Sequence, residues 1–272
     1  MTEALVRDRP QIDDPEELDR VVKRVVEQLD PIAIYLFGSR ARGESWRDSD
    51  YDLMVVVRDQ RLANASATQK VRSAAQSERI DANVFLTRQS AHTWRRHEVG
   101  TLEYEAEVDG VELYPNFGRR AREADQLEIF GTANVAVVSE WLDEVQRDLF
   151  GARSCARGEW VVLDRAAFHV QQAAEKLAKA ALVAHRIRPD RTHDIGEAVE
   201  RLPDGFPLKG RLLELDRFTD YAVVFRYPGA PRPAIPCSAE VDAWVEEIEV
   251  LKTDFERWLK ESTRGKRKRR ER

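Results

Sequence analysis

The segment LFGSRARGESWRDSDYDLMVVV, from Leu36 to Val57, decides the fold of the N-terminal half of this 272-residue chain. It joins two apolar runs, 32–38 and 51–57, which are rich in β-branched and aromatic residues, as short buried strands are. Between the runs lies a turn rich in glycine, serine and arginine, followed by two aspartates that flank a tyrosine. The segment therefore predicts a strand, a polar loop and a second strand.

The sequence around this segment alternates helical and strand patterns. Residues 15–29 place apolar side chains three and four positions apart, as an amphipathic helix requires. Residues 62–79 also have a helical pattern, whereas 79–86 and 110–115 predict further strands. Helices interleaved with short strands predict an α+β domain over residues 1–115, built as a small mixed sheet with flanking helices.

The C-terminal half carries only helical periodicity. After a linker at residues 116–135, apolar side chains repeat every three or four positions through residues 136–262. About five helices, including a short one after His193, are expected to bury these stripes against one another as an all-α helical bundle. The last residues, 263–272, are predicted to form a basic, disordered tail.

Composition narrows the class of protein. Apolar residues make up 42% of the chain and charged residues 34%, which is typical of a soluble globular protein. No apolar run is long enough to cross a bilayer and the N-terminus has no signal-peptide core, so we expect a cytoplasmic protein with no membrane partner. The two cysteines and five histidines are scattered, which indicates free thiols and argues against a zinc site.

Charge is spread unevenly along the chain. The last nine residues hold seven basic residues and one acid, so the tail carries +6 of a net charge of −5 and the rest of the chain carries −11. A basic tail can attract RNA by counterion release, or it can simply keep the chain soluble. The acidic body argues against a dedicated duplex-binding surface.

The turn after the first predicted strand has the character of a phosphate site. Gly38 and Ser39 stand where a strand ends and a helix opens, so backbone N–H groups and a hydroxyl can approach a phosphate closely. Arg40 and Arg42 add positive charge beside it. Gly38, Ser39 and Arg42 are therefore the candidate nucleotide-binding residues.

Three aspartates form a candidate metal site. Asp50 and Asp52 flank Tyr51 at the start of a strand, so both carboxylates face one side, roughly 6.5–7 Å apart at Cα. Asp81, near the start of the next strand, adds a third carboxylate to that face. Each feature alone is more often a turn or a surface charge, but their order indicates a site for two Mg²⁺ ions and transfer from a nucleoside triphosphate (NTP).

The motifs GSRARG (38–43) and SDYDL (49–53) resemble those of the minimal nucleotidyltransferases in the DNA polymerase β-like superfamily. The resemblance covers about residues 15–115. It implies that the glycine and serine of the first motif hold the triphosphate and that Asp50, Asp52 and Asp81 ligate Mg²⁺. It also implies that Asp81 helps to activate the acceptor, and that an NTP such as ATP is the substrate.

A second resemblance covers about residues 136–260. The pattern FHVQQAAEKLAKA (168–180), followed by RTHDI (191–195) and FRYPG (225–229), resembles the HEPN domain. This implies a fold like the helical half of aminoglycoside nucleotidyltransferases. Such domains often accompany minimal nucleotidyltransferases as fusions or toxin–antitoxin partners, and they commonly dimerise, so a homodimer is expected by analogy.

Many HEPN proteins are metal-independent ribonucleases that use an arginine and, after four to six residues, a histidine near the last helix. No histidine follows Arg226 in this chain. Arg186 or Arg188 with His193 satisfies the spacing, but between the second and third helices. We therefore expect His193 to cap or anchor the helix that begins at Asp194.

These patterns predict an enzyme, a Mg²⁺-dependent nucleotidyltransferase that moves a nucleoside monophosphate (NMP) to a hydroxyl acceptor. The acceptor is either a small molecule, such as an aminoglycoside, or a protein side chain, such as a tyrosine. The alternative is a toxin–antitoxin-type regulatory module whose HEPN half binds or cleaves RNA. A third hypothesis is a scaffold that binds nucleotide without turnover. The base and the acceptor stay open.

Overall fold

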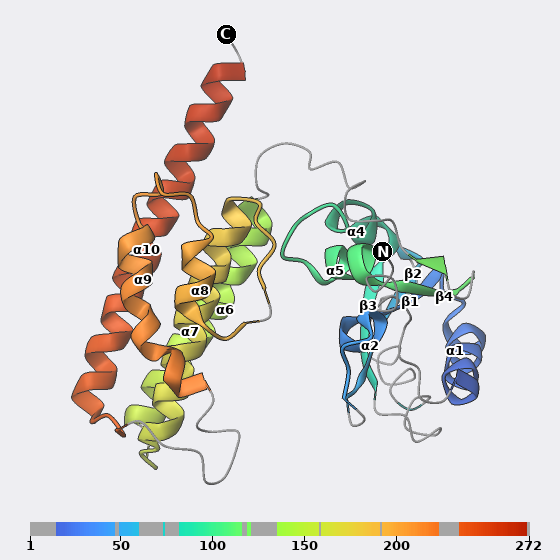
Figure 1. The fold of residues 1–272 in the computed structure, drawn as a ribbon, viewed down its shortest axis with the longest axis horizontal. Helices are drawn as coiled ribbons and strands as arrows, with labels where there is room; N and C mark the ends of the chain where they lie inside the picture. Colours follow the sequence, from blue (N-terminus) through green and yellow to red (C-terminus); the bar gives the residue numbers. More distant parts are fainter. Residues whose placement is uncertain are drawn as a thin grey trace, which may run out of the picture. The chain divides into compact units, whose positions relative to one another are not determined.

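A computed structural model of the chain describes residues 15–46, 49–59, 73, 82–115, 119–120, 135–157, 159–190, 192–222 and 234–270. The chain divides into two compact units, Met1–Phe130 and Gly131–Arg272, which are coloured from blue to green and from yellow to red in Figure 1. Each unit has its own hydrophobic core.

The first unit is built around a five-stranded mixed sheet in the order β3-β2-β1-β4-β5. Strands β2 and β3 pair in parallel, and the other neighbouring pairs are antiparallel. The α+β prediction is therefore confirmed. Along the chain the elements are α1 (Pro15–Leu29), β1 (Ala33–Phe37), α2 (Gly38–Arg42), β2 (Tyr51–Val57), β3 (Ala82–Arg88), α4 (Gln89–Arg95), α5 (Leu102–Asp109), β4 (Val111–Tyr114) and β5 (Arg119–Arg120).

Helices cover both faces of this sheet (Figure 1). Alternate residues of β1 point to opposite sides, so Ile34 and Leu36 pack with the apolar stripe of α1. Phe37 lies on the other face, in a smaller cluster with Met54 of β2 and Ala106 of α5. Because strand side chains alternate, Asp52 shares the face of Met54. The acidic end of β2 therefore belongs to the α5 side of the sheet.

The predicted elements differ from the observed ones in three places. Helices α4 and α5 have no counterpart in the prediction. The predicted helix 62–79 lies, apart from Ser73, outside the described residues. The predicted linker, 116–135, contains strand β5, in which Arg119 pairs with Glu112 of β4.

The second unit is helical, as predicted. Its core is formed by buried side chains of all its described helices, with Leu149 from α6, Leu177 from α7 and Phe255 from α10 among them. None of the helices in the described part of the chain is long and apolar enough to cross a membrane. The elements are α6 (Val135–Arg157), α7 (Leu163–Ala184), α8 (Ile195–Glu200), α9 (Lys209–Leu213), the 3₁₀ helix η3 (Glu214–Ala222) and α10 (Ser238–Arg270).

The basic tail, predicted to be disordered from residue 263, instead continues helix α10 to Arg270. Lysine and arginine are good helix formers, and positive charge near a helix C-terminus is favoured by the helix dipole. These two effects give a physical reason for the extension, despite Gly265 within it.

Candidate active site

The turn between β1 and α2 places backbone directly against a carboxylate. Gly38 has a φ of +84°, a conformation that side-chain-bearing residues adopt only with strain. A β-carbon added there would lie 2.2 Å from Oδ2 of Asp52, so no side chain fits between them. The short helix ends at Arg42 and is capped by Gly43, whose φ is +71° and whose N–H donates to the carbonyl of Arg40. The predicted phosphate turn and the predicted metal ligand are therefore neighbours.

Asp50 and Asp52 lie together, as their spacing predicts. In the sheet, Asp52 stands opposite Phe37 of β1 and Asn83 of β3. The amide nitrogen Nδ2 of Asn83 is 3.3 Å from Oδ2 of Asp50 and 3.2 Å from Oδ1 of Asp52. A single side chain thus donates to both carboxylates.

The surroundings of Asp52 oppose the ionisation of its carboxyl group. Burial raises the pKa of Asp52 above its usual value, and the neighbouring Asp50 carboxylate adds to this. The hydrogen bond from Asn83 and the charge of Arg42 lower the pKa without cancelling these effects. Two close, partly desolvated carboxylates are the oxygen ligands that a hard divalent cation prefers. The donor set therefore fits such a cation.

The third predicted ligand, Asp81, lies outside the described residues. Among the residues that are described, no group of three or more acids, histidines or cysteines is arranged to hold a metal ion. The described chain thus contributes a carboxylate pair to the candidate metal centre, and the role of Asp81 stays a prediction.

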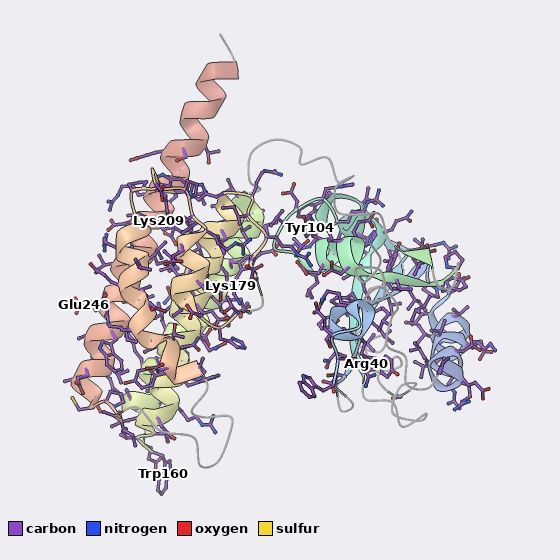
Figure 2. All side chains as sticks on the ribbon, in the orientation of Figure 1. Arg40, Tyr104, Trp160, Lys179, Lys209 and Glu246 are labelled. Carbon is purple, nitrogen blue, oxygen red and sulfur yellow. The ribbon has the colours of Figure 1, made fainter. Side chains whose placement is uncertain are left out.

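Arg40 does not take the position that its sequence context suggested. It is buried, and its Nε donates to the carbonyl of Ser49 at 2.7 Å. Its guanidinium carbon lies 4.1 Å from the centroid of the Tyr51 ring. Arg40, labelled in Figure 2, therefore stabilises the backbone on either side of Asp50, through its contacts with Ser49 and Tyr51.

Arg42 is held near the carboxylate pair. Its Nε donates to Oε2 of Glu44 at 2.7 Å and its Nη1 to Oδ2 of Asp109 at 3.2 Å. Its Nη2 is buried and has no hydrogen-bond partner among the described residues. Ser39, the remaining candidate, is half-buried in the first turn of α2. Arg42 thus has one donor group left for an anion.

Sequence reasoning missed Asn83 and Asp109. Asn83 follows Asp81 by two positions in a strand, so the period-two rule that grouped the aspartates also places it on their face. Asp109 offers no comparable signal, because its contact with Arg42 joins positions 67 residues apart.

In the second unit, the polar face of α7 forms a network with its neighbours. Asp148 of α6 contacts Nδ1 of His169 at 3.1 Å and Nζ of Lys176 at 2.6 Å. Burial opposes ionisation of Asp148, but these two hydrogen bonds outweigh it and lower its pKa. Gly151 makes room for the imidazole, since a β-carbon there would lie 3.0 Å from Nδ1 of His169.

A second cluster in this network centres on buried Glu175. It accepts hydrogen bonds from Gln171 and from Lys179, each at 2.7 Å. Nδ1 of His193 lies 3.2 Å from the same carboxylate, so His193 anchors the loop before α8 to α7. Asp194 caps α8 by accepting from the N–H of Glu197. The anchoring role expected for His193 is confirmed, whereas Arg226 lies outside the described residues.

Two protein families match the chain, one in each unit. The family described as Polymerase beta, Nucleotidyltransferase matches residues 20–115, which contain the sheet and the carboxylate pair. The HEPN domain family matches residues 138–261, which contain the α7 network. No curated protein matches the chain. The two matches, nucleotidyltransferase first and HEPN second along the chain, confirm the resemblances seen in the sequence.

Proposed function

We propose that this protein transfers an NMP from an NTP to a hydroxyl group of an acceptor, at a site that binds two Mg²⁺ ions. The observation that carries the proposal is the close approach of Gly38 to Asp52, which places the glycine-serine turn against the carboxylate pair. The match of residues 20–115 to the nucleotidyltransferase family supports the reaction class.

Each candidate residue has a part in the proposed reaction. Asp50 and Asp52 hold the cations, with Asp81 as a third ligand. When bound, the cations neutralise the triphosphate and lower the pKa of the acceptor hydroxyl. The N–H groups and hydroxyl at Gly38 and Ser39 hold the triphosphate, and Nη2 of Arg42 donates to a phosphate oxygen.

The proposed reaction is a nucleotidyl transfer. Asp81 accepts the proton of the acceptor hydroxyl, and the acceptor oxygen forms a bond to the α-phosphorus. The bond from the α-phosphorus to the bridging oxygen breaks, and pyrophosphate leaves. Positioning of the reactants and compensation of charge supply the rate enhancement, as in other phosphoryl-type transfers.

A double variant, Asp50→Asn with Asp52→Asn, tests this proposal. We expect it to abolish Mg²⁺-dependent pyrophosphate release, because amides are poor ligands for Mg²⁺ and carry no compensating charge. Asp19→Asn is the matched control, since Asp19 lies in α1, where its half-exposed side chain pairs with Lys23. Undiminished release by the double variant overturns the proposal.

The class of acceptor is to be determined by mass spectrometry. The purified chain is incubated with each NTP and Mg²⁺, with and without an added aminoglycoside. A mass gain on a tyrosine of the protein identifies a protein acceptor, and a gain on the added compound identifies a small molecule. NTP binding without any product supports the scaffold hypothesis instead.

A second candidate function rests on the HEPN match, namely a toxin–antitoxin-type module whose helical half binds or cleaves RNA. The contact of His193 with Glu175 argues against a role of this histidine in cleavage, because it gives His193 a structural role. In addition, the described residues that line a surface cavity of about 450 Å³ include three acids, Glu140, Asp143 and Glu144, and two cations, Arg147 and Lys176. Metal-free incubation with tRNA and total RNA tests this function, and cleavage that is lost in His193→Ala supports it.

A further inference from the structure

The amide of Asn83 is placed between the two carboxylates of the candidate metal centre. Its nitrogen lies 3.3 Å from Asp50 and 3.2 Å from Asp52, and it contacts one oxygen of each. Ionised carboxylates only accept hydrogen bonds, so the NH₂ end of the amide must face them. Both of its N–H groups are thereby used, and each carboxylate keeps a second oxygen for another ligand.

The backbone fixes this arrangement. Asn83 stands directly opposite Asp52 in the parallel ladder of β2 and β3, so the amide reaches the carboxylate across neighbouring strands. Further along β3, on the same face, buried Thr87 donates to Glu103 of α5 at 2.8 Å. This second contact ties the strand to the helix that covers it. The position of Asn83 therefore depends on sheet register.

Asn83 contributes little to the hydrophobic core. Its side chain is exposed, and its neighbours in the strand, not Asn83 itself, pack into the two clusters of the sheet. This exposed side chain uses both of its N–H donors to hold two carboxylates, and so it can keep those carboxylates in position to bind a ligand. Its loss should leave folding almost unchanged, as is usual for surface substitutions.

We propose that Asn83 is a positioning residue for the divalent cation at this site. Its amide occupies one oxygen of Asp50 and one of Asp52, which fixes both carboxylates and leaves their other oxygens to ligate the cation. Hydrogen-bond partners of metal ligands commonly act in this way, and their loss weakens metal affinity about 10- to 100-fold. This inference rests on the proposed function, because it assumes that the carboxylate pair binds the cation.

The test measures Mn²⁺ binding to the full chain by electron paramagnetic resonance, without nucleotide or turnover. Asn83→Leu has nearly the same size and no donors. We expect it to raise the Kd for Mn²⁺ about tenfold or more, while the metal-free thermal unfolding midpoint stays at the wild-type value. A wild-type Kd for Asn83→Leu overturns the positioning role.

Two further variants separate this inference from the proposed function. Thr87→Val removes the side-chain hydrogen bond from β3 to Glu103. It should lower the unfolding midpoint and leave the Kd for Mn²⁺ unchanged. A raised Kd in Thr87→Val would show that strand stability alone accounts for the effect at Asn83. The Asp50→Asn, Asp52→Asn double variant should lose Mn²⁺ binding; if it binds as wild type does, the proposed function fails, whatever the result at Asn83.

Discussion

Gly38 and Asp52 are packed so closely that a β-carbon on Gly38 would stand 2.2 Å from Oδ2 of the aspartate. The turn that follows β1 and the acidic end of β2 therefore meet as backbone against carboxylate. Strand pairing brings them there, since Asp52 is opposite Phe37, the residue that precedes Gly38. The proposed triphosphate turn and the proposed metal ligand cannot shift independently of each other.

Gly38→Ala should consequently damage the site more than the fold. The positive φ costs about 1–3 kcal/mol for alanine, and the methyl group must displace the Asp52 carboxylate. We expect the rate of pyrophosphate release to fall by about 100-fold or more, because a displacement of about 1 Å at a catalytic group can reduce the rate by this factor. Gly210→Ala is the control, since a β-carbon there meets nothing within 4 Å. Equal activities of the two variants would refute the coupling.

Asp109 should affect nucleotide binding through Arg42. It accepts from Nη1 of Arg42 at 3.2 Å, and both side chains are largely buried. Asp109→Asn weakens this charge-assisted bond, so the guanidinium is less well fixed toward the phosphates. We expect the KM for NTP to rise about tenfold with little change in kcat, the pattern for loss of uniform binding. Glu44→Gln, which alters the exposed partner of Arg42, should change KM far less.

The sequence predicts those helices and strands in which the apolar residues are also the buried ones. Helix α1 and strand β2 have the predicted bounds, because each carries its own apolar signature. In β2 every residue from Leu53 to Val57 is buried, which gives a continuous apolar run. The placement of Asp50 and Asp52 on one face could be predicted from the same strand, because side chains two positions apart in a strand point to the same side.

Helix α5 could not be predicted this way, because its burial does not follow hydrophobicity. Glu103 and Glu107 are buried in it, whereas Leu102 is exposed. Glu103 is held by Thr87 and by Arg95, contacts that only the folded chain brings together. The contact of Asp109 with Arg42 could not be predicted either, because folding brings together two positions that are 67 residues apart in the sequence.

Stability should depend on pH through His92. Its ring is buried and stacks on Tyr35, with centroids 5.7 Å apart. Burial, and then the charge of Arg96, lowers the pKa of His92 from 6.5 to about 4. Between these values the unfolded chain binds the proton and the folded protein does not, so the free energy of unfolding falls as pH drops from 6.5 towards 4. At the lower end the loss from this group is about 3 kcal/mol.

His92→Phe keeps a stacked ring and removes the titration. Its free energy of unfolding should change less with pH in this window than that of the wild type, as measured by urea unfolding at several pH values. Parallel curves for the two proteins would mean that His92 is not the group responsible.

In the second unit, Asp148 should stabilise the packing of α6 against α7. It accepts from both His169 and Lys176, and its own side chain is largely buried. Asp148→Asn leaves the partly buried Lys176 without its counter-charge, which should cost about 1–3 kcal/mol at pH 7. Asp143→Asn, on the exposed side of the same helix, should stay within about 0.5 kcal/mol of wild type. Urea unfolding followed by tryptophan fluorescence measures both.

The sign of the pH effect adds a second check. Hydrogen bonds from His169 and Lys176 outweigh burial and lower the pKa of Asp148 below its ordinary value of 3.8. A depressed carboxyl pKa contributes stability above that ordinary value, and the contribution disappears as pH falls through the lower, folded-state pKa. The difference between wild type and Asp148→Asn should therefore be full at pH 7 and shrink below about pH 3.8. A difference that is independent of pH would mean that shape, and not charge, makes Asp148 important.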